Sequence, residues 1–232
     1  MPYYKYTQTW FSHSEIKYHM ATLLDKSKEN HILEIGCYEG LSSVFFADNF
    51  INVEGSTEST ESTESTESTE STGSTLTCVD PFLNIDNNDH KYLLQNGEEL
   101  NFDYNISKCK NTEKITIHKM TADDFFIMTA KAAKAAKAAK AAKAAKTAKA
   151  FNFIYVDGSR EPDLIKRDME NSFSVLEKQG IMWMNGYDDG GYGNGNDDGD
   201  VIKKVMDDFL DKYAGQYIVV HKGYQLAIRR IM

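Results

Sequence analysis

A glycine-bounded turn between a short apolar run and a helix-like run constrains the fold of this chain more than any other stretch. Residues 31–40 read HILEIGCYEG, and LSSVFFADNF follows directly. The pattern predicts a buried strand, a turn from Gly36 to Gly40, and a helix. Glycine permits positive φ and the close approach of another group, and ligands of parallel α/β sheets bind beyond the carboxyl ends of the strands. The stretch therefore predicts an α/β fold with a ligand-binding loop at residues 36–40.

The spacing of the two glycines limits the kind of ligand. The loop has the form G-x-x-x-G, and Tyr38 stands where a dinucleotide-binding loop of the form G-x-G-x-x-G carries its second glycine. This spacing disfavours a pyrophosphate-binding loop and, with it, an NAD-type oxidoreductase.

A second apolar run ends in an acidic residue. Residues 76–79 read LTCV, and Asp80 and Pro81 follow. An ionised carboxylate at a strand end has acceptor sites for both hydroxyls of a ribose, and the alternative is an ordinary turn or cap aspartate. Asp80 lies further from Gly36 than the roughly 20 to 30 residues that usually separate such positions. A low-complexity insert between them accounts for the excess.

Two repeats interrupt an otherwise ordinary α/β sequence. Residues 55–74 are a Ser-Thr-Glu insert, and residues 129–150 are an Ala-Lys insert. The first offers no apolar face and is expected to stay solvated, whereas the second favours an exposed helix whose lysines spiral around the axis. Without the inserts the chain has the size of one α/β domain. We therefore expect a single domain over residues 1–232 with two surface inserts.

Composition narrows the class of partner. Asp and Glu outnumber Lys and Arg by 35 to 26, which disfavours nucleic acid, and no run of 18 apolar residues suggests a membrane span. The three cysteines have no C-x-x-C spacing and are interpreted as buried thiols of a reducing compartment. The N-terminus has no signal-peptide core, so a cytoplasmic protein is expected. The partner is then a small molecule, and the oligomeric state stays open.

The remaining segments complete a parallel sheet. The last two strands are joined by Lys222 and Gly223, a link too short for a parallel crossover, so they form an antiparallel hairpin. The pattern predicts a Rossmann-like α/β fold: a seven-stranded, mostly parallel sheet with helices on both faces. Further strands are expected at 115–118, 151–156, 181–184, 217–221 and 224–231, and helices at 14–24, 89–95, 163–178 and 201–213. Thr121 is expected to cap a helix after the 115–118 strand.

Five motifs together carry a family resemblance: ILEIGCYEG, TCVDPF, FNFIYVDGSREPDLIKRD, KQGIMWMNGY and GYQLAIRR. As a set they resemble class I methyltransferases that use S-adenosylmethionine (SAM), of the methyltransferase-24 type. This type includes sugar O-methyltransferases, some from large DNA viruses, which would place the protein in a host cytoplasm. The resemblance implies a SAM site made of Glu34, Gly36, Cys37, Tyr38, Gly40, Asp80, Pro81, Met120, Thr121, Ala122, Asp123 and Asp157.

The resemblance also implies a catalytic centre at the end of the 151–156 strand. In related sugar O-methyltransferases, a carboxylate matching Asp157 and a later Asp-Asp pair hold a divalent cation that binds the acceptor hydroxyl. This chain has Asn185 and Gly186 in place of that pair, and a hard cation such as Mg²⁺ would lose two charges of support. Asp188 and Asp189, three positions on, are the alternative ligands if the loop folds back, although Asp-Gly clusters usually form plain turns. Arg160 stands where the family often has His. The candidate catalytic residues are Asp157 and Arg160, and the candidate metal ligands are Asp157 and Asn185.

Two functions fit these residues. One is SAM-dependent transfer of a methyl group to a hydroxyl of a small molecule or a sugar, with Asp157 as base or metal ligand. The other is a catalytically degenerate scaffold that holds SAM, because the pair of aspartates is missing. The aromatic N-terminus is interpreted as cover for the core edge, with Trp10, Ser12 and His13 as alternative pocket residues.

Overall fold

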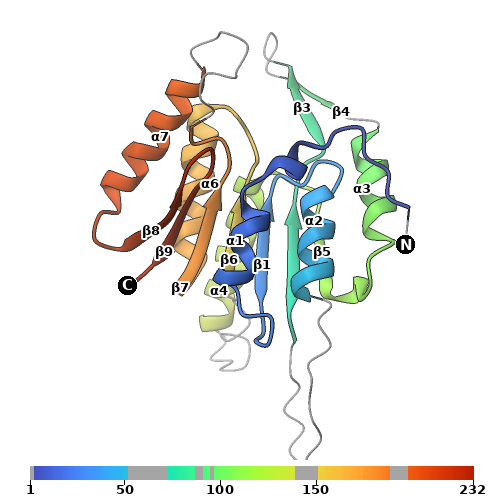
Figure 1. The fold of residues 1–232 in the computed structure, drawn as a ribbon, viewed down its shortest axis with the longest axis horizontal. Helices are drawn as coiled ribbons and strands as arrows, with labels where there is room; N and C mark the ends of the chain where they lie inside the picture. Colours follow the sequence, from blue (N-terminus) through green and yellow to red (C-terminus); the bar gives the residue numbers. More distant parts are fainter. Residues whose placement is uncertain (1–2, 52–72, 87–90, 95–96, 139–150, 189–197) are drawn as a thin grey trace, which may run out of the picture.

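A seven-stranded sheet forms the centre of the molecule, with the strand order β5-β2-β1-β6-β7-β9-β8 (Figure 1). The computed structural model describes residues 3–51, 73–86, 91–94, 97–138, 151–188 and 198–232. The strands of this sheet are β1 (His31–Ile35), β2 (Thr75–Val79), β5 (Ile115–His118), β6 (Phe151–Val156), β7 (Leu176–Met184), β8 (Tyr217–Lys222) and β9 (Leu226–Arg230).

Pairing within the sheet is parallel except at β9. β1 pairs in parallel with β2 and β6, and the parallel pattern continues outward to β5 and β7. β9 is antiparallel to both β7 and β8, as the short link between the last two strands predicts. The predicted fold class is therefore confirmed, and the carboxyl ends of five parallel strands meet at one edge.

Helices cover both faces, because neighbouring strand residues point to opposite sides. Ile32 packs in one core cluster with Met20, Phe46 and Phe102. Leu33 packs in a second cluster with residues of the opposite helical layer. The first layer is α1 (Ile16–Leu23), α2 (Leu41–Phe46) and α3 (Glu98–Ile106), and the second is α4 (Ala122–Ala138), α6 (Pro162–Val175) and α7 (Asp198–Lys212).

The polar region after β2 differs from its prediction. The helix expected at 89–95 is wrong, because β4 (Lys91–Leu94) lies there and pairs antiparallel with β3 (Leu83–Asp86). A helix does form just downstream, α3 (Glu98–Ile106), with Phe102 and Ile106 on its buried face. Residues 84–96 are mostly polar, and their few apolar residues show neither a helical nor a strand periodicity. The sequence pattern therefore did not distinguish a hairpin from a helix.

The helix expected at 163–178 also ends early. α6 stops at Val175, and β7 begins at once with Leu176, whose backbone is extended. Gln179 takes a positive φ of 68° inside β7, and the β6–β7 register shifts nearby. Short irregular turns complete the described chain: 3₁₀ turns at Trp10–His13 and Thr112–Lys114, and a π turn at Ala47–Ile51.

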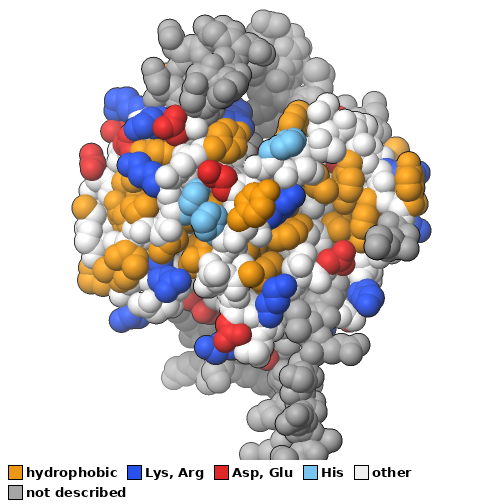
Figure 2. All heavy atoms as spheres, viewed as in Figure 1, with side chains coloured by type: hydrophobic (Ala, Val, Ile, Leu, Met, Phe, Trp, Pro, Cys, Tyr) orange, Lys and Arg blue, Asp and Glu red, His pale blue; other side chains and the backbone are white. Residues whose placement is uncertain are grey.

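Most of the two inserts lies outside the described residues, and the single-domain organisation stays a prediction. Only the start of the Ala-Lys insert is described, as the second half of α4, where Lys131 and Lys134 are exposed. On the face seen in Figure 2, acidic and basic side chains are interspersed. None of the helices among the described residues is long and apolar enough to cross a membrane.

Candidate functional site

Backbone hydrogen bonds bring five strand ends together at one edge of the sheet. Each residue just beyond a strand donates its N–H to the last residues of a neighbouring strand. The bonds run from Gly36 to Val79 (2.9 Å), from Asp80 to His118 (3.2 Å), from Asp157 to Ile35 (2.9 Å) and from Asn185 to Val156 (3.0 Å). The loops after β1, β2, β6 and β7 therefore form one surface, the usual ligand edge of an α/β sheet.

The two glycines of the first loop are required by packing. Gly36 has φ +84°, and a Cβ there would lie 2.2 Å from the carbonyl oxygen of Asp157. Gly40 has φ +80°, and its Cβ would lie 2.9 Å from the ring of Phe102. Both positions combine a left-handed backbone with a close neighbour, so only glycine fits. The loop is thus held against the end of β6 and against α3.

Asp80 holds the first loop through its carboxylate. Oδ2 accepts hydrogen bonds from the backbone N–H groups of Cys37 (2.7 Å) and Tyr38 (2.9 Å), and Oδ1 accepts one from Phe82 (2.7 Å), across Pro81. Burial raises the pKa of Asp80 above its ordinary value, although these three N–H groups pull it down. A carboxylate has about four acceptor sites, so Asp80 keeps room for one further donor, such as a ribose hydroxyl.

Glu34 lies beneath the loop. It is 0 % exposed, and its two carboxyl oxygens accept hydrogen bonds from the hydroxyls of Ser42 and Ser43 at the start of α2. Burial raises the pKa of Glu34 to about 8. In this structure Glu34 therefore ties α2 to β1 from inside the core.

Cys37 and Cys78 lie beside Glu34, and the ligand atoms of the three residues are within 4.8 Å of one another. Sequence spacing did not indicate this cluster, because the residues come together only through the β1–β2 pairing. Both thiols are free and buried, and burial raises the pKa of each. Since metals bind the thiolate, these protonated thiols are poor ligands.

Two residues that sequence reasoning missed fasten the N-terminal segment to the loop. Glu39 accepts hydrogen bonds from the Thr7 backbone (2.6 Å), the Thr7 hydroxyl (2.9 Å) and the Asn101 side chain (2.8 Å). Asn105, which is 0 % exposed, bonds to both backbone groups of Lys5 (2.7 Å each) and to the carbonyl of Glu39 (2.8 Å). No local pattern in the sequence marks these contacts.

Aromatic side chains stand over the loop. Tyr38 has φ 48° and lies next to Trp10, with ring centroids 5.3 Å apart. Trp10 is 67 % exposed, whereas Phe11 packs edge-on against Tyr155 at 5.9 Å. The N-terminal aromatics therefore divide: Phe11 covers the core edge, and Trp10 extends the surface beside the loop.

The segment from Met120 to Asp123 begins α4. Thr121 caps the helix as predicted: its hydroxyl accepts the N–H of Asp124 at 3.2 Å and donates to the Asp124 carboxylate at 2.8 Å. Met120 and Ala122 pack against the core, and Asp123 pairs with Arg167 at 2.5 Å. Contact of this segment with an adenine ring stays a prediction.

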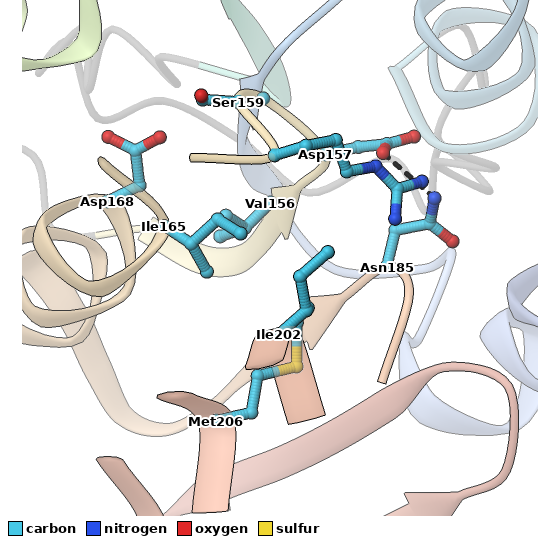
Figure 3. A pocket seen from close by; sticks show the side chains of 10 residues that line it. Val156, Asp157, Ser159, Ile165, Asp168, Asn185, Ile202 and Met206 are labelled. Carbon is cyan, nitrogen blue, oxygen red and sulfur yellow. Dashed lines mark hydrogen bonds between the residues drawn. The ribbon is translucent and has the colours of Figure 1, made fainter. Parts of the chain in front are cut away.

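The end of β6 carries a charged centre with a pocket beside it (Figure 3). Asp157 accepts hydrogen bonds from Asn185 Nδ2 (2.8 Å) and from the Tyr155 hydroxyl (3.0 Å). Burial raises the pKa of Asp157 above its ordinary value, against the opposing effects of Asn185, the Arg160 charge and Tyr155. The pocket is lined by Val156, Asp157, Gly158, Ser159, Arg160, Ile165, Asp168, Asn185, Ile202 and Met206.

Asp168 is a pocket residue that the sequence did not single out. It sits on α6, is 7 % exposed, and its carboxylate would lie 3.2 Å from a Cβ at Gly158. Burial raises the pKa of Asp168 to about 7, with a further rise from the charge of Asp123. Its position on a helix face looked like that of any partly buried acid in an amphipathic helix, so no sequence signal distinguished it.

Comparison with known families identifies the chain. A family model of the methyltransferase-24 type, described as a methyltransferase domain, matches residues 33–187. The chain belongs to this methyltransferase family. The match begins in β1 and ends just after β7, so it contains the loop, Asp80 and the Asp157 centre. Among curated protein sequences, none matches the chain.

Solved structures share the fold of this methyltransferase at low identity. The O-methyltransferase from Bacillus cereus, in complex with SAH, has a TM-score of 0.57 at 11 % identity, covering 94 % of this chain and 82 % of that one. The O-methyltransferase TomG from Streptomyces achromogenes, in complex with SAM, has a TM-score of 0.57 at 12 % identity, covering 92 % and 77 %. At these identities the likeness concerns the fold.

Proposed function

We propose that this methyltransferase binds SAM and transfers its methyl group to a hydroxyl of a small molecule or a sugar. The observation that carries the proposal is the family match over residues 33–187, which contains every strand end at the ligand edge except that of the antiparallel hairpin. O-methyltransferases with SAM or SAH bound are among the structures of the same fold.

The residues of the edge suit the cofactor. Asp80 retains an acceptor site for a ribose hydroxyl, and the loop from Gly36 to Gly40 stands next to it with Tyr38 on its surface. SAM supplies a methyl group on a positively charged sulfur, which an oxygen nucleophile attacks in line. The chain's part is to bind and orient the cofactor at the loop and to draw a proton from the acceptor at the end of β6.

Asp157 is the residue best suited to take that proton. An alcohol is a poor nucleophile at neutral pH, and a positioned carboxylate improves it by accepting the hydroxyl proton. Asp157 follows β6 directly, next to the loop, and its backbone oxygen is the atom that Gly36 approaches. The remaining acceleration of methyl transfer comes from holding the acceptor, the base and the cofactor close together.

A specific feature favours a second candidate, a SAM-binding scaffold without transferase activity. Asn185 and Gly186 stand where two acidic residues were expected, and they offer no negative charge. The centre keeps one carboxylate, Asp157, which already accepts two hydrogen bonds. The two candidates share the cofactor and differ only in turnover.

The test separates these functions in two measurements. Calorimetry with SAH and with NAD reports the cofactor, and we expect SAH to bind and NAD not to bind. Transfer of labelled methyl from SAM to a panel of sugars and small alcohols then reports turnover, which Asp157→Asn is expected to abolish; the SAH affinity of this variant is measured in parallel. NAD binding without SAH binding would contradict the proposal, and SAH binding without turnover on any acceptor would favour the scaffold.

A further inference from the structure

Hydrogen bonds fix the amide of Asn185 in the orientation that a cation cannot use. Gln225 Oε1 accepts bonds from Ser14 Oγ (2.8 Å), the backbone N–H of Ile16 (3.1 Å) and Trp183 Nε1 (2.9 Å). The last two groups are donors only, so the oxygen of Gln225 must face them and its Nε2 must face Asn185. Nε2 donates to the oxygen of Asn185 at 2.7 Å, and the nitrogen of Asn185 therefore faces Asp157.

This series of hydrogen bonds removes Asn185 as a ligand of the expected metal site. A hard divalent cation takes lone pairs of oxygen, whereas the Asn185 oxygen faces Gln225 and its Nδ2, which is only a donor, faces Asp157. The Asp157 carboxylate already accepts from Asn185 Nδ2 and from the Tyr155 hydroxyl. Among the residues that the structure describes, no group of three His, Cys, Asp or Glu ligand atoms within 4.8 Å includes Asp157 or Asp188, and Asp189 lies outside the described residues. The described residues at the end of β6 do not fit Mg²⁺.

A guanidinium occupies the space beside Asp157 instead. Gly186 has φ +78°, and a Cβ at this position would lie 2.4 Å from Nη1 of Arg160. The side chain of a carboxylate at position 186 would thus project into the space that Arg160 fills. The Arg160 charge acts on Asp157, and no residue that the structure describes forms a hydrogen bond or an ion pair with the guanidinium. Arg160 is exposed and keeps its donors for a ligand.

We infer that the Arg160 guanidinium takes the place of the divalent cation, and that it binds an oxyanion, a carboxylate or a phosphate, carried by the acceptor next to the hydroxyl that is methylated. This inference rests on the proposed function. A guanidinium presents parallel N–H groups that match an oxyanion in a bidentate geometry, which a neutral hydroxyl does not use fully. Selection of an anionic acceptor follows from this geometry.

The reaction then balances without a metal ion. The hydroxyl proton passes to the Asp157 carboxylate, and an oxygen lone pair forms the new O–CH₃ bond. The electrons of the broken S–CH₃ bond stay on sulfur, which changes from a sulfonium to a neutral thioether. Arg160 keeps its charge throughout and holds the acceptor's oxyanion.

The first experiment measures metal binding independently of turnover. SAH-loaded protein is titrated with Mn²⁺ by electron paramagnetic resonance, with Asp157→Asn as the matched variant, because exposed acids elsewhere bind Mn²⁺ weakly in both proteins. We expect identical titrations. Tighter Mn²⁺ binding by the native protein than by Asp157→Asn would overturn the inference. Failure of the native protein to bind SAH in the same samples would instead remove the proposed function.

The second experiment measures the oxyanion. Inorganic phosphate and acetate are titrated separately into SAH-loaded protein while the Arg160 side-chain N–H signals are followed by nuclear magnetic resonance. We expect a saturable shift that identifies which of the two anions binds more tightly. Affinity should fall at least about tenfold in Arg160→Gln and less in Arg160→Lys, with SAH affinity unchanged. Absence of a saturable shift, or equal affinity in Arg160→Gln, would overturn the inference.

Discussion

At the scale of residues, three acids near the ligand edge differ because their partners differ. Asp80 accepts three backbone N–H groups, Asp157 accepts an amide and a phenol, and Asp168 lies buried on α6 beside the charge of Asp123. Hydrogen bonds to a carboxylate favour its charged form, and burial opposes it. The same residue type thus holds a loop, accepts bonds from two side chains, or resists ionisation.

Replacing Asp80 tests its hold on the loop. Asp80→Ala leaves the N–H groups of Cys37, Tyr38 and Phe82 without their acceptor and removes the site that we propose for a ribose hydroxyl. Because hydrogen bonds to charged groups contribute about 1.5 to 3 kcal/mol, we expect SAH affinity to fall roughly 10- to 100-fold in calorimetry. Asp163→Asn, an exposed acid on α6, is the control. Unchanged SAH affinity in Asp80→Ala would mean that the ribose is held elsewhere.

Replacing Asp168 tests a pH dependence. Its pKa rises from 3.8 to about 7 on folding, so between these values the folded chain binds a proton that the unfolded chain has lost. Stability from this group therefore falls as pH rises through that window, by up to about 1.4 kcal/mol per pH unit. Asp168→Asn should lack this fall, so at pH 8 its free energy of unfolding, measured by urea denaturation, should exceed that of the native protein. If the free energies of unfolding of the two proteins change in parallel from pH 4 to 8, the prediction is contradicted. Asp163→Asn again serves as control.

Single residues also mark where sequence reasoning stopped. The family resemblance predicted that Asp157 and Arg160 belong to one centre just after β6. They did not predict the orientation of Asn185, which depends on Gln225 in the last hairpin and on Trp183 in β7. Such orientations come from donor and acceptor matching between distant segments, which no local pattern records.

At the scale of elements, α3 joins the N-terminal segment to the first loop. Asn105 on α3 reaches Lys5 and Glu39, and Phe102 on the same helix fills the space that Gly40 leaves open. The strands of the seven-stranded sheet and the capped start of α4 were predictable, because short apolar runs and capping are local signals. α3 was not predictable, because its apolar residues show no clear helical periodicity.

Removing the Asn105 side chain should free the N-terminal segment. Asn105→Ala loses the three hydrogen bonds of a fully buried amide side chain, and we expect a loss of about 2 to 3 kcal/mol in the free energy of unfolding, with fast amide exchange at Lys5. Asn101→Ala, which removes one bond to Glu39 from the same helix, is the matched control and should cost less. Retained protection at Lys5 in Asn105→Ala would show that other contacts hold the segment.

At the scale of the whole molecule, one rule gave the architecture: apolar strands followed by helices build a parallel sheet whose ligand edge is set by the strand ends. The observed order is β5-β2-β1-β6-β7-β9-β8, and the sequence predicted its antiparallel end, because the link between β8 and β9 is too short for a crossover. Neither insert contributes a strand to this sheet, because every strand of it lies outside residues 55–74 and 129–150.

The last prediction concerns the two inserts, which contribute no strand to the sheet. Replacing residues 56–72 and 130–146 with short Gly-Ser linkers should preserve the fold and the SAH affinity, because halving a loop changes its closure free energy by only about 0.6 kcal/mol. The second cut removes the part of α4 in which Lys131 and Lys134 are exposed and keeps the buried Phe125 and Phe126. Circular dichroism, thermal unfolding and calorimetry with SAH would compare the shortened and full chains, each cut also made alone. Loss of folding or of SAH binding in a shortened chain would place that insert inside the domain and contradict a single domain with two surface inserts.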